Sequence, residues 1–131
     1  MKMIFSRGFN GELKKNENSL SINAKAFQPY DLTMAGLVSC LYATFLDVLY
    51  KEELRVYRCE IEYSYHKREE YPYTLDKVDI KYTVDSSNNV YELREALKTA
   101  SKNCSMYYTI SQVSDINLEL EVKPKISIKL F

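Results

Sequence analysis

The sequence carries no net charge, because its 18 basic residues are cancelled by 18 acidic residues. Proteins that bind nucleic acid or an anionic membrane surface through bulk electrostatics have an excess of basic side chains. The charge balance gives no support for either partner. We therefore expect this protein to bind neither nucleic acid nor a membrane.

Motifs for metals and nucleotides are also missing. His66 is the only histidine, and it lies in a charged run with Lys67, Arg68, Glu69 and Glu70. No cysteine or histidine spacing matches a zinc site. The GxSxG, P-loop and dinucleotide-binding patterns do not occur either. We expect no metal and no cofactor.

Cysteine is scarce, with three residues and no CxxC pair. An odd count without paired spacing does not form the disulfide framework of a small secreted protein. The first 15 residues lack the continuous apolar stretch of a signal peptide. The chain is therefore expected in the cytoplasm, where thiols are normally reduced.

One long apolar stretch is present, from Gln28 to Tyr50. It is apolar on nearly every face, which predicts a helix buried on all sides. Its length would suffice for a membrane span, but Asp31 and Asp47 interrupt it, which favours a core helix. Pro29 and Asp31 suit its first turn. A chain of 131 residues offers little cover for such a helix, so we expect a homodimer.

Strands are predicted on both sides of this helix. Residues 1 to 26 contain short apolar alternations that indicate two or three antiparallel strands, and the segment from Ser6 to Gly11 is typical of a hairpin tip. Residues 55 to 66 and 78 to 84 alternate cleanly and predict a pair of half-buried strands. Cys59 falls on an apolar face of the first of these strands, so its role is interpreted as structural.

A second, amphipathic helix is indicated by Asn89, a residue suited to the N-cap, with Glu92 three positions later. The helical pattern ends at residues 101 to 103, and Cys104 follows. Further strands are predicted at 116 to 122 and, beyond Pro124, at 126 to 130. The sequence predicts one α+β domain over residues 1–131, with antiparallel sheets packed on a long buried central helix and on the amphipathic helix.

This order of elements resembles the family of osmotically inducible protein C and the organic hydroperoxide resistance proteins. Two motifs carry the resemblance. The first is a proline followed by small and apolar residues that end in a cysteine, here Pro29 to Cys40. The second is a short helical segment followed by a cysteine, here Ala96 to Cys104.

The resemblance implies an intertwined homodimer with a thiol peroxidase site near the subunit interface. In this family the helix cysteine, Cys40 here, attacks the peroxide, and the later cysteine, Cys104 here, resolves the product as a disulfide. The substrate implied is an organic hydroperoxide, and the implied reductant is a dithiol, such as a lipoyl group. Attack requires a thiolate and yields a sulfenic acid, which a second thiol must reach before it is oxidised further.

The resemblance also implies a cation that stabilises the thiolate. Family members use an arginine from the N-terminal strands, held by a glutamate near the start of the long helix. Arg7 at the hairpin tip is the best match for the arginine, with an ordinary solvated loop charge as the alternative. Asp31 stands closest to the expected glutamate and is either an orienting carboxylate or a helix cap. The proline that often follows the second cysteine is replaced by Ser105.

Two functions follow as hypotheses. The first is a cysteine-based peroxidase that reduces organic hydroperoxides in oxidative-stress defence, because the apolar helix wall around Cys40 suits fatty or aromatic substrates. The second is a non-catalytic dimer that binds a hydrophobic small molecule.

Overall fold

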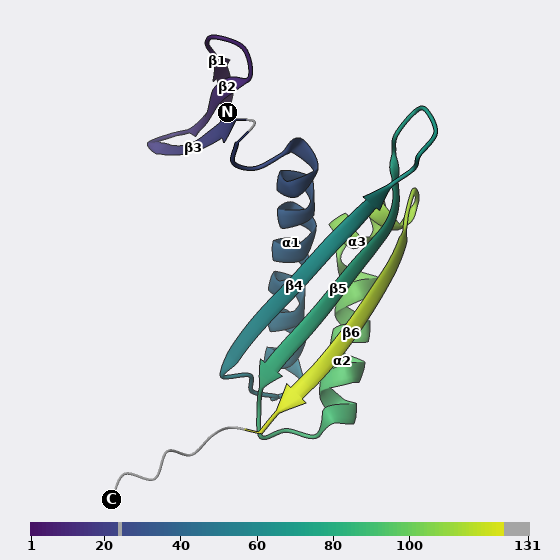
Figure 1. Ribbon diagram of the computed structural model, residues 1–131. Coiled ribbons are helices and arrows are strands. Elements are labelled where there is room, and N and C mark those ends of the chain that lie inside the picture. The colour runs from purple at the N-terminus through teal and green to yellow at the C-terminus, as the bar shows by residue number, and fades with distance from the viewer. Residues whose placement is uncertain (24, 125–131) are drawn as a thin grey trace, which may run out of the picture. The chain divides into compact units, whose positions relative to one another are not determined.

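The computed structural model describes residues 1–23 and 25–124 (Figure 1). Contacts divide the chain into two compact units, Met1–Ala35 and Gly36–Phe131, and the border falls inside the first helix. The strand predicted for residues 126 to 130 lies outside the described residues. The extent of a single domain over the whole chain stays a prediction.

The N-terminal unit contains an antiparallel sheet. Its strands are β1 (Lys2–Phe5), β2 (Asn10–Lys15) and β3 (Asn18–Asn23), in the order β1-β2-β3. The turn between β1 and β2 has left-handed backbone at Arg7 and Gly8, with φ of 53° and 73°. The Ser6 N–H closes this turn by donating to the Asn10 carbonyl at 2.9 Å. The hairpin tip predicted from the sequence is confirmed.

Helix α1 (Pro29–Lys51) corresponds to the long apolar stretch. Proline is tolerated at the first helical position because its missing N–H has no partner there. The Asp31 carboxylate accepts a hydrogen bond from the Gln28 N–H at 2.8 Å. This bond satisfies a donor that the helix start leaves without an intrahelical partner. It accounts for the sharp beginning of α1.

The second unit contains a sheet of strands β4 (Arg58–Lys67), β5 (Leu75–Asp85) and β6 (Asp115–Lys123), in that order. β4 pairs antiparallel with β5, as predicted. β5 and β6 pair in parallel, so the expectation of purely antiparallel sheets is wrong for this strand. Two helices connect β5 to β6, and such a long crossover allows the chain to return in the same direction.

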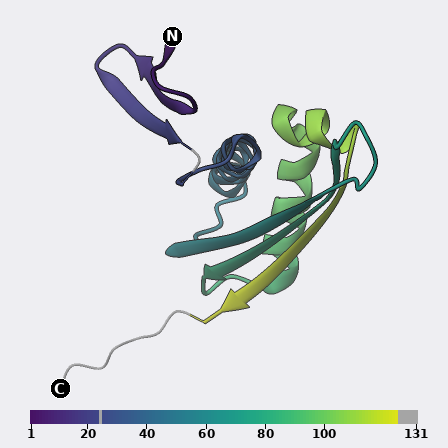
Figure 2. The same ribbon diagram turned by 45° about the horizontal axis from the view of Figure 1, so that its top comes forward.

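The helices of this unit lie together on one face of the sheet, as Figures 1 and 2 show for α1 from Gly36 onward, α2 (Val90–Asn103) and α3 (Ser105–Ser111). Strand β5 turns Val78, Ile80, Tyr82 and Val84 into the core, where all four are buried. Phe45 of α1 meets Tyr82 edge to face, with ring centroids 5.7 Å apart. The alternation read from the sequence therefore identifies the buried face correctly.

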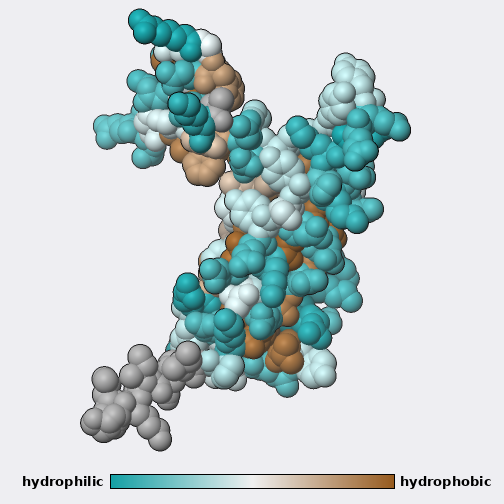
Figure 3. Space-filling model, viewed as in Figure 1, coloured by the Kyte–Doolittle hydropathy of each residue, from teal (hydrophilic) through white to brown (hydrophobic). Residues whose placement is uncertain are grey.

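The opposite face of the sheet is mainly hydrophilic (Figure 3). Asp79 and Lys81 of β5 and Glu119 and Glu121 of β6 alternate with the inward residues and are exposed. Lys81 and Glu121 form an ion pair at 3.3 Å on this face. These charged side chains make this face of the sheet compatible with exposure to solvent.

Burial of α1 is one-sided within a single chain. Leu37, Leu41 and Phe45 are fully buried, whereas the stripe Ser39, Ala43, Leu46 and Tyr50 is exposed. The prediction that α1 is buried on all sides is therefore wrong for a single chain. Among the described residues, α1 is the helix long and apolar enough to cross a membrane by length and composition, and the core helices of soluble proteins pass the same test.

Candidate functional site

Helix α1 places Cys40 well inside its length, about three turns from the start. The thiol is half-buried, and the buried side chains Leu37 and Leu41 lie beside it on the helix. The positive end of the helix dipole acts mainly within the first turn. Any stabilisation of a Cys40 thiolate must therefore come from other groups.

Cys104 stands at the junction of two helices. It is both the C-cap of α2 and the N-cap of α3, with extended backbone at φ −83° and ψ 116°. Its sulfur accepts a hydrogen bond from the Tyr107 N–H at 3.4 Å, as a capping side chain does. The side chain is buried, with 1% of its surface exposed. The break between α2 and α3 is what aims this thiol inward.

The structure brings the two cysteines together. The Cys104 thiol donates to the Cys40 sulfur across 3.3 Å, although the residues are 64 positions apart. All three cysteines carry free thiols. A disulfide requires a sulfur–sulfur distance of about 2.05 Å, so an approach of little more than ~1 Å would bring the two sulfurs to bonding distance once an oxidant acts on them. The contact makes Cys40 and Cys104 a dithiol pair.

The environment differentiates the two thiols. The hydrogen bond from Cys104 is the largest cause that lowers the pKa of Cys40, and the Met106 N–H and the Ser105 hydroxyl lower it further against the opposing effect of burial. Burial is the largest cause that raises the pKa of Cys104, and its contact with Cys40 adds to this rise. Of the two thiols, Cys40 is therefore the one that loses its proton more readily, and Cys104 is the one that retains it more strongly.

The third cysteine lies in a different environment. Cys59 is half-buried on β4, opposite Val84 of β5. Burial raises its pKa to about 11. Such a thiol is almost entirely protonated at neutral pH and is a poor nucleophile. This environment supports the interpretation of Cys59 as a packing residue.

Tyr82 is a buried polar group near the pair. The side chain is fully buried, and within the described residues its hydroxyl has no hydrogen-bond partner. Burial raises its pKa, and the nearby thiols Cys59 and Cys104 raise it further. The raised pKa favours the neutral phenol at this position.

Arg7 and Asp31 both belong to the N-terminal unit. Arg7 occupies the β1–β2 turn, as predicted, and its approach to Cys40 stays a prediction. The Asp31 carboxylate caps α1 through the Gln28 N–H. This is the second of the two roles considered for Asp31, and a role in orienting the arginine stays a prediction.

Ser105 and the Met106 N–H were not identified from the sequence as donors to Cys40. The sequence does show a serine directly after the second cysteine, at a helix start. Recognising it as a donor requires knowing that residues 40 and 105 meet in space. Met106 also packs on α1, since its terminal methyl group lies 3.5 Å from where a Cβ at Gly36 would stand. This contact seats the start of α3 against the turn that precedes Cys40.

The structure is that of a small α+β protein in which Cys40 of α1 contacts Cys104 at the junction of α2 and α3. The sequence profile described as OsmC-like protein matches residues 22–119. The chain belongs to this OsmC-like family. The matched range includes Cys40 and Cys104 and begins after the β1–β2 turn that contains Arg7.

Solved structures of low sequence identity share the fold. A hypothetical protein from Aquifex aeolicus VF5 superposes with a TM-score of 0.86 at 20% identity, over 95% of this chain and 96% of its own. An OsmC like protein from Mycoplasma pneumoniae gives 0.81 at 16% identity, over 95% of each chain. The organic hydroperoxide resistance protein OhrB of Bacillus subtilis gives 0.64 at 18% identity, over 92% of this chain and 96% of its own. Comparison with curated proteins gives no match.

Proposed function

We propose that the protein is a cytoplasmic thiol peroxidase that reduces organic hydroperoxides and uses Cys40 as the nucleophile and Cys104 as the resolving thiol. The observation that carries the proposal is the 3.3 Å contact in which the Cys104 thiol donates to the Cys40 sulfur. Membership of the OsmC-like family supports it, as does the likeness to a protein named for organic hydroperoxide resistance.

The proposed reaction begins with attack of the Cys40 thiolate on the terminal oxygen of the hydroperoxide. A sulfur–oxygen bond forms, the oxygen–oxygen bond breaks, and the leaving alkoxide takes up a proton to become an alcohol. Cys40 is oxidised to a sulfenic acid. The lowered pKa of Cys40 increases the thiolate fraction that starts this step at neutral pH.

The second step joins the two cysteines. The Cys104 sulfur attacks the Cys40 sulfur, and the hydroxyl group leaves as water with the proton from Cys104. One hydroperoxide and two thiols thus give one alcohol, one water and one disulfide. An external dithiol, such as the lipoyl group that the family resemblance implies, restores the pair by thiol–disulfide exchange. The short sulfur–sulfur distance allows this step to compete with further oxidation of the sulfenic acid.

Arg7, from the same or the partner chain, is proposed to supply a positive charge beside the Cys40 thiolate. An arginine beside a thiolate favours the charged form. The Ser105 and Met106 donors already act on Cys40 within the second unit. Arg7 therefore adds to an existing stabilisation, and removing it slows the reaction without abolishing it.

Turnover of cumene hydroperoxide with a dithiol reductant tests the proposal. We expect turnover by the wild type, none by Cys40→Ser, and a reduced rate with a preserved fold for Arg7→Ala. Lys2→Ala, which removes a cation from the same sheet, is the matched control for Arg7. No turnover by the wild type would favour a non-catalytic member of the family that binds a hydrophobic small molecule.

A further inference from the structure

A groove runs between α2 and strand β6, with a volume of about 790 Å³. Its floor contains the half-buried side chains of Ile116, Leu118 and Leu120 from β6. These three residues alternate along the strand, so they lie in a row on one face, and at ~3.3 Å per residue the row is about 13 Å long. This row, the apolar strip of the groove, gives it an elongated hydrophobic floor.

The α2 wall of the groove is basic. Arg94 and Lys98 line it one helical turn apart, and Ser101 follows them. Residues spaced by three or four positions share one face of a helix. Both cations are exposed, and neither forms an ion pair within residues 1–23 and 25–124. The groove therefore offers two positive charges that this part of the chain does not neutralise.

The acidic residues near the groove lie outside its interior. Glu92 and Glu95 are on the other flank of α2, where they line a different hollow of about 430 Å³. Glu119 and Glu121 lie at the rim, because they alternate with the apolar strip and belong to the hydrophilic face of the sheet. Lys81 pairs with Glu121 there at 3.3 Å. The interior thus combines positive charge with an apolar floor.

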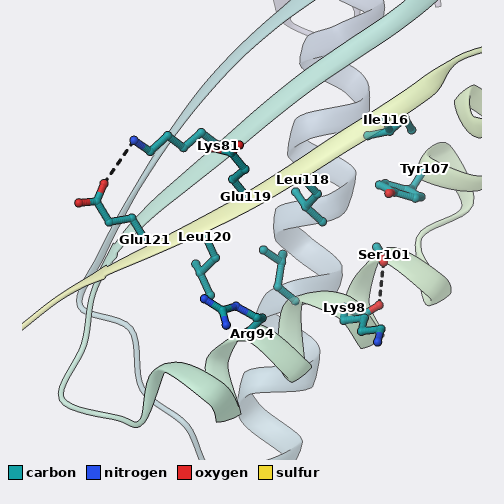
Figure 4. A pocket seen from close by; sticks show the side chains of 11 residues that line it. Lys81, Arg94, Lys98, Ser101, Tyr107, Ile116, Leu118, Glu119, Leu120 and Glu121 are labelled. Carbon is teal, nitrogen blue, oxygen red and sulfur yellow. Dashed lines mark hydrogen bonds and ion pairs between the residues drawn. The ribbon is translucent and has the colours of Figure 1, made fainter.

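The two ends of the groove differ. Figure 4 shows Arg94 beside Leu120 at one end and Tyr107 beside Ile116 at the other. Tyr107 is half-buried, and burial raises its pKa, which favours the neutral phenol. A ligand that matches both ends is elongated, with an anionic head near Arg94 and an apolar body that extends toward Tyr107.

We propose that the groove between α2 and β6 binds a soluble fatty carboxylate, with the head group held by Arg94 and Lys98 and the acyl chain lying along the apolar strip. A guanidinium group can hold a carboxylate through two parallel hydrogen bonds. Each buried methylene group adds affinity, so the strip favours a long chain over a short organic acid. Neither Cys40 nor Cys104 is among the residues that line the groove, so the proposal does not depend on the peroxidase reaction.

Titration of the full-length protein with dodecanoate, kept below its micellar concentration, tests the proposal by amide NMR. We expect saturable chemical-shift changes at Lys98, Leu118 and Leu120. Octanoate should bind about tenfold or more weakly, because it buries fewer methylene groups. Dodecyltrimethylammonium has the same alkyl chain length with the opposite charge and should not displace dodecanoate.

Two charge reversals separate the head-group contact from general electrostatics. Arg94→Glu should weaken dodecanoate binding by about tenfold or more, because it removes a charge-assisted hydrogen bond. Arg58→Glu makes the same change at an exposed residue of β4, the strand at the other edge of this sheet, and should leave the affinity nearly unchanged. Circular dichroism reports whether each variant is folded.

Three results would overturn the proposal. The first is the absence of saturable shifts along the groove. The second is equal weakening of binding by Arg94→Glu and Arg58→Glu, because the effect would then come from net charge rather than from a contact. The third is equal binding of dodecanoate and dodecyltrimethylammonium, because the groove would then recognise the alkyl chain alone.

Discussion

The surroundings of Cys40 and Cys104 shift the pKa values of the two thiols in opposite directions, and the proposed chemistry depends on this difference. Cys40 accepts hydrogen bonds from the Cys104 thiol, the Ser105 hydroxyl and the Met106 N–H. Burial raises the pKa of Cys104, which favours its protonated form. In the proposed reaction, this difference in position makes one of two identical side chains the nucleophile and the other the resolving thiol.

Ser105 provides a direct test of this stabilisation. Ser105→Ala removes one hydrogen bond to the Cys40 thiolate, so the pKa of Cys40 should rise. Because only the thiolate reacts, the rise of the alkylation rate with pH should move to higher pH. At neutral pH, alkylation of Cys40 should slow by about two- to fivefold. The measurement is iodoacetamide alkylation of Cys40, followed by peptide mass mapping across a pH series.

The matched variant for this test is Ser105→Thr, which keeps the hydroxyl group and should keep the wild-type profile. A profile that is unchanged in Ser105→Ala would show that the serine hydroxyl does not act on the thiolate. The peptide that contains Cys59 serves as an internal reference, because its alkylation should not depend on residue 105.

Cys59 should be dispensable for catalysis. Its pKa, raised to about 11 by burial, leaves almost no thiolate at neutral pH, and it packs opposite Val84 in the sheet. Cys59→Ser should therefore retain peroxide reduction within about threefold of the wild type, as expected for a residue outside the reacting pair. The check is the cumene hydroperoxide assay, with circular dichroism as the control for folding. Loss of activity in a folded variant would mean that the redox pair is wrongly assigned.

At the scale of the elements, the start of α2 is a local feature that can be tested alone. The Asn89 side chain accepts from the Tyr91 N–H at 2.7 Å and caps the helix whose other end is Cys104. Asn89→Ala should lower the free energy of unfolding by about 1 kcal/mol. Asn89→Asp retains an acceptor and should be close to neutral. Chemical denaturation of both variants measures the difference, and an equal loss in both would reject the cap.

Local patterns predicted most of the elements. The alternation in β4 and β5 identifies their faces because a strand repeats every two residues, and Asn89 marks the start of α2 because a helix leaves free N–H groups there. The parallel pairing of β5 with β6 was missed. Strand direction depends on the path of the crossover through space, and a β-strand has the same side-chain period whichever way it runs.

The candidate site was likewise predicted in part. Cys40 and Cys104 were selected by resemblance to a family, and their contact at 3.3 Å joins residues 64 positions apart. No spacing rule reaches across that separation. The donors at Ser105 and Met106 depend on how α3 is seated against α1, and this is set by packing between helices rather than by either segment alone.

At the scale of the whole molecule, we expect a homodimer. The stripe Ser39, Ala43, Leu46 and Tyr50 leaves one side of α1 exposed, and Tyr50 is 86% exposed. An exposed apolar stripe on a long helix is typical of a protein interface. Light scattering at micromolar concentration should give about twice the chain mass of 15.4 kDa.

A charge in this stripe should separate the subunits. Leu46→Asp should shift the mass toward the monomer, because an unpaired carboxylate is costly to bury in an apolar interface. Tyr73→Asp introduces the same charge at an exposed apolar residue of the β4–β5 connection and should leave the dimer intact. A wild type that is monomeric at this concentration would contradict the interface.

The most direct test of the redox pair is peptide mapping after one equivalent of cumene hydroperoxide, with free thiols blocked by an alkylating reagent. The proposed chemistry predicts an intrachain Cys40–Cys104 disulfide, with Cys59 alkylated as in the untreated protein. In Cys104→Ser, the same treatment should leave a sulfenic acid on Cys40 that a dimedone-type reagent traps. If Cys40 and Cys104 are still both fully alkylated after peroxide treatment, the two cysteines do not form a peroxidase pair.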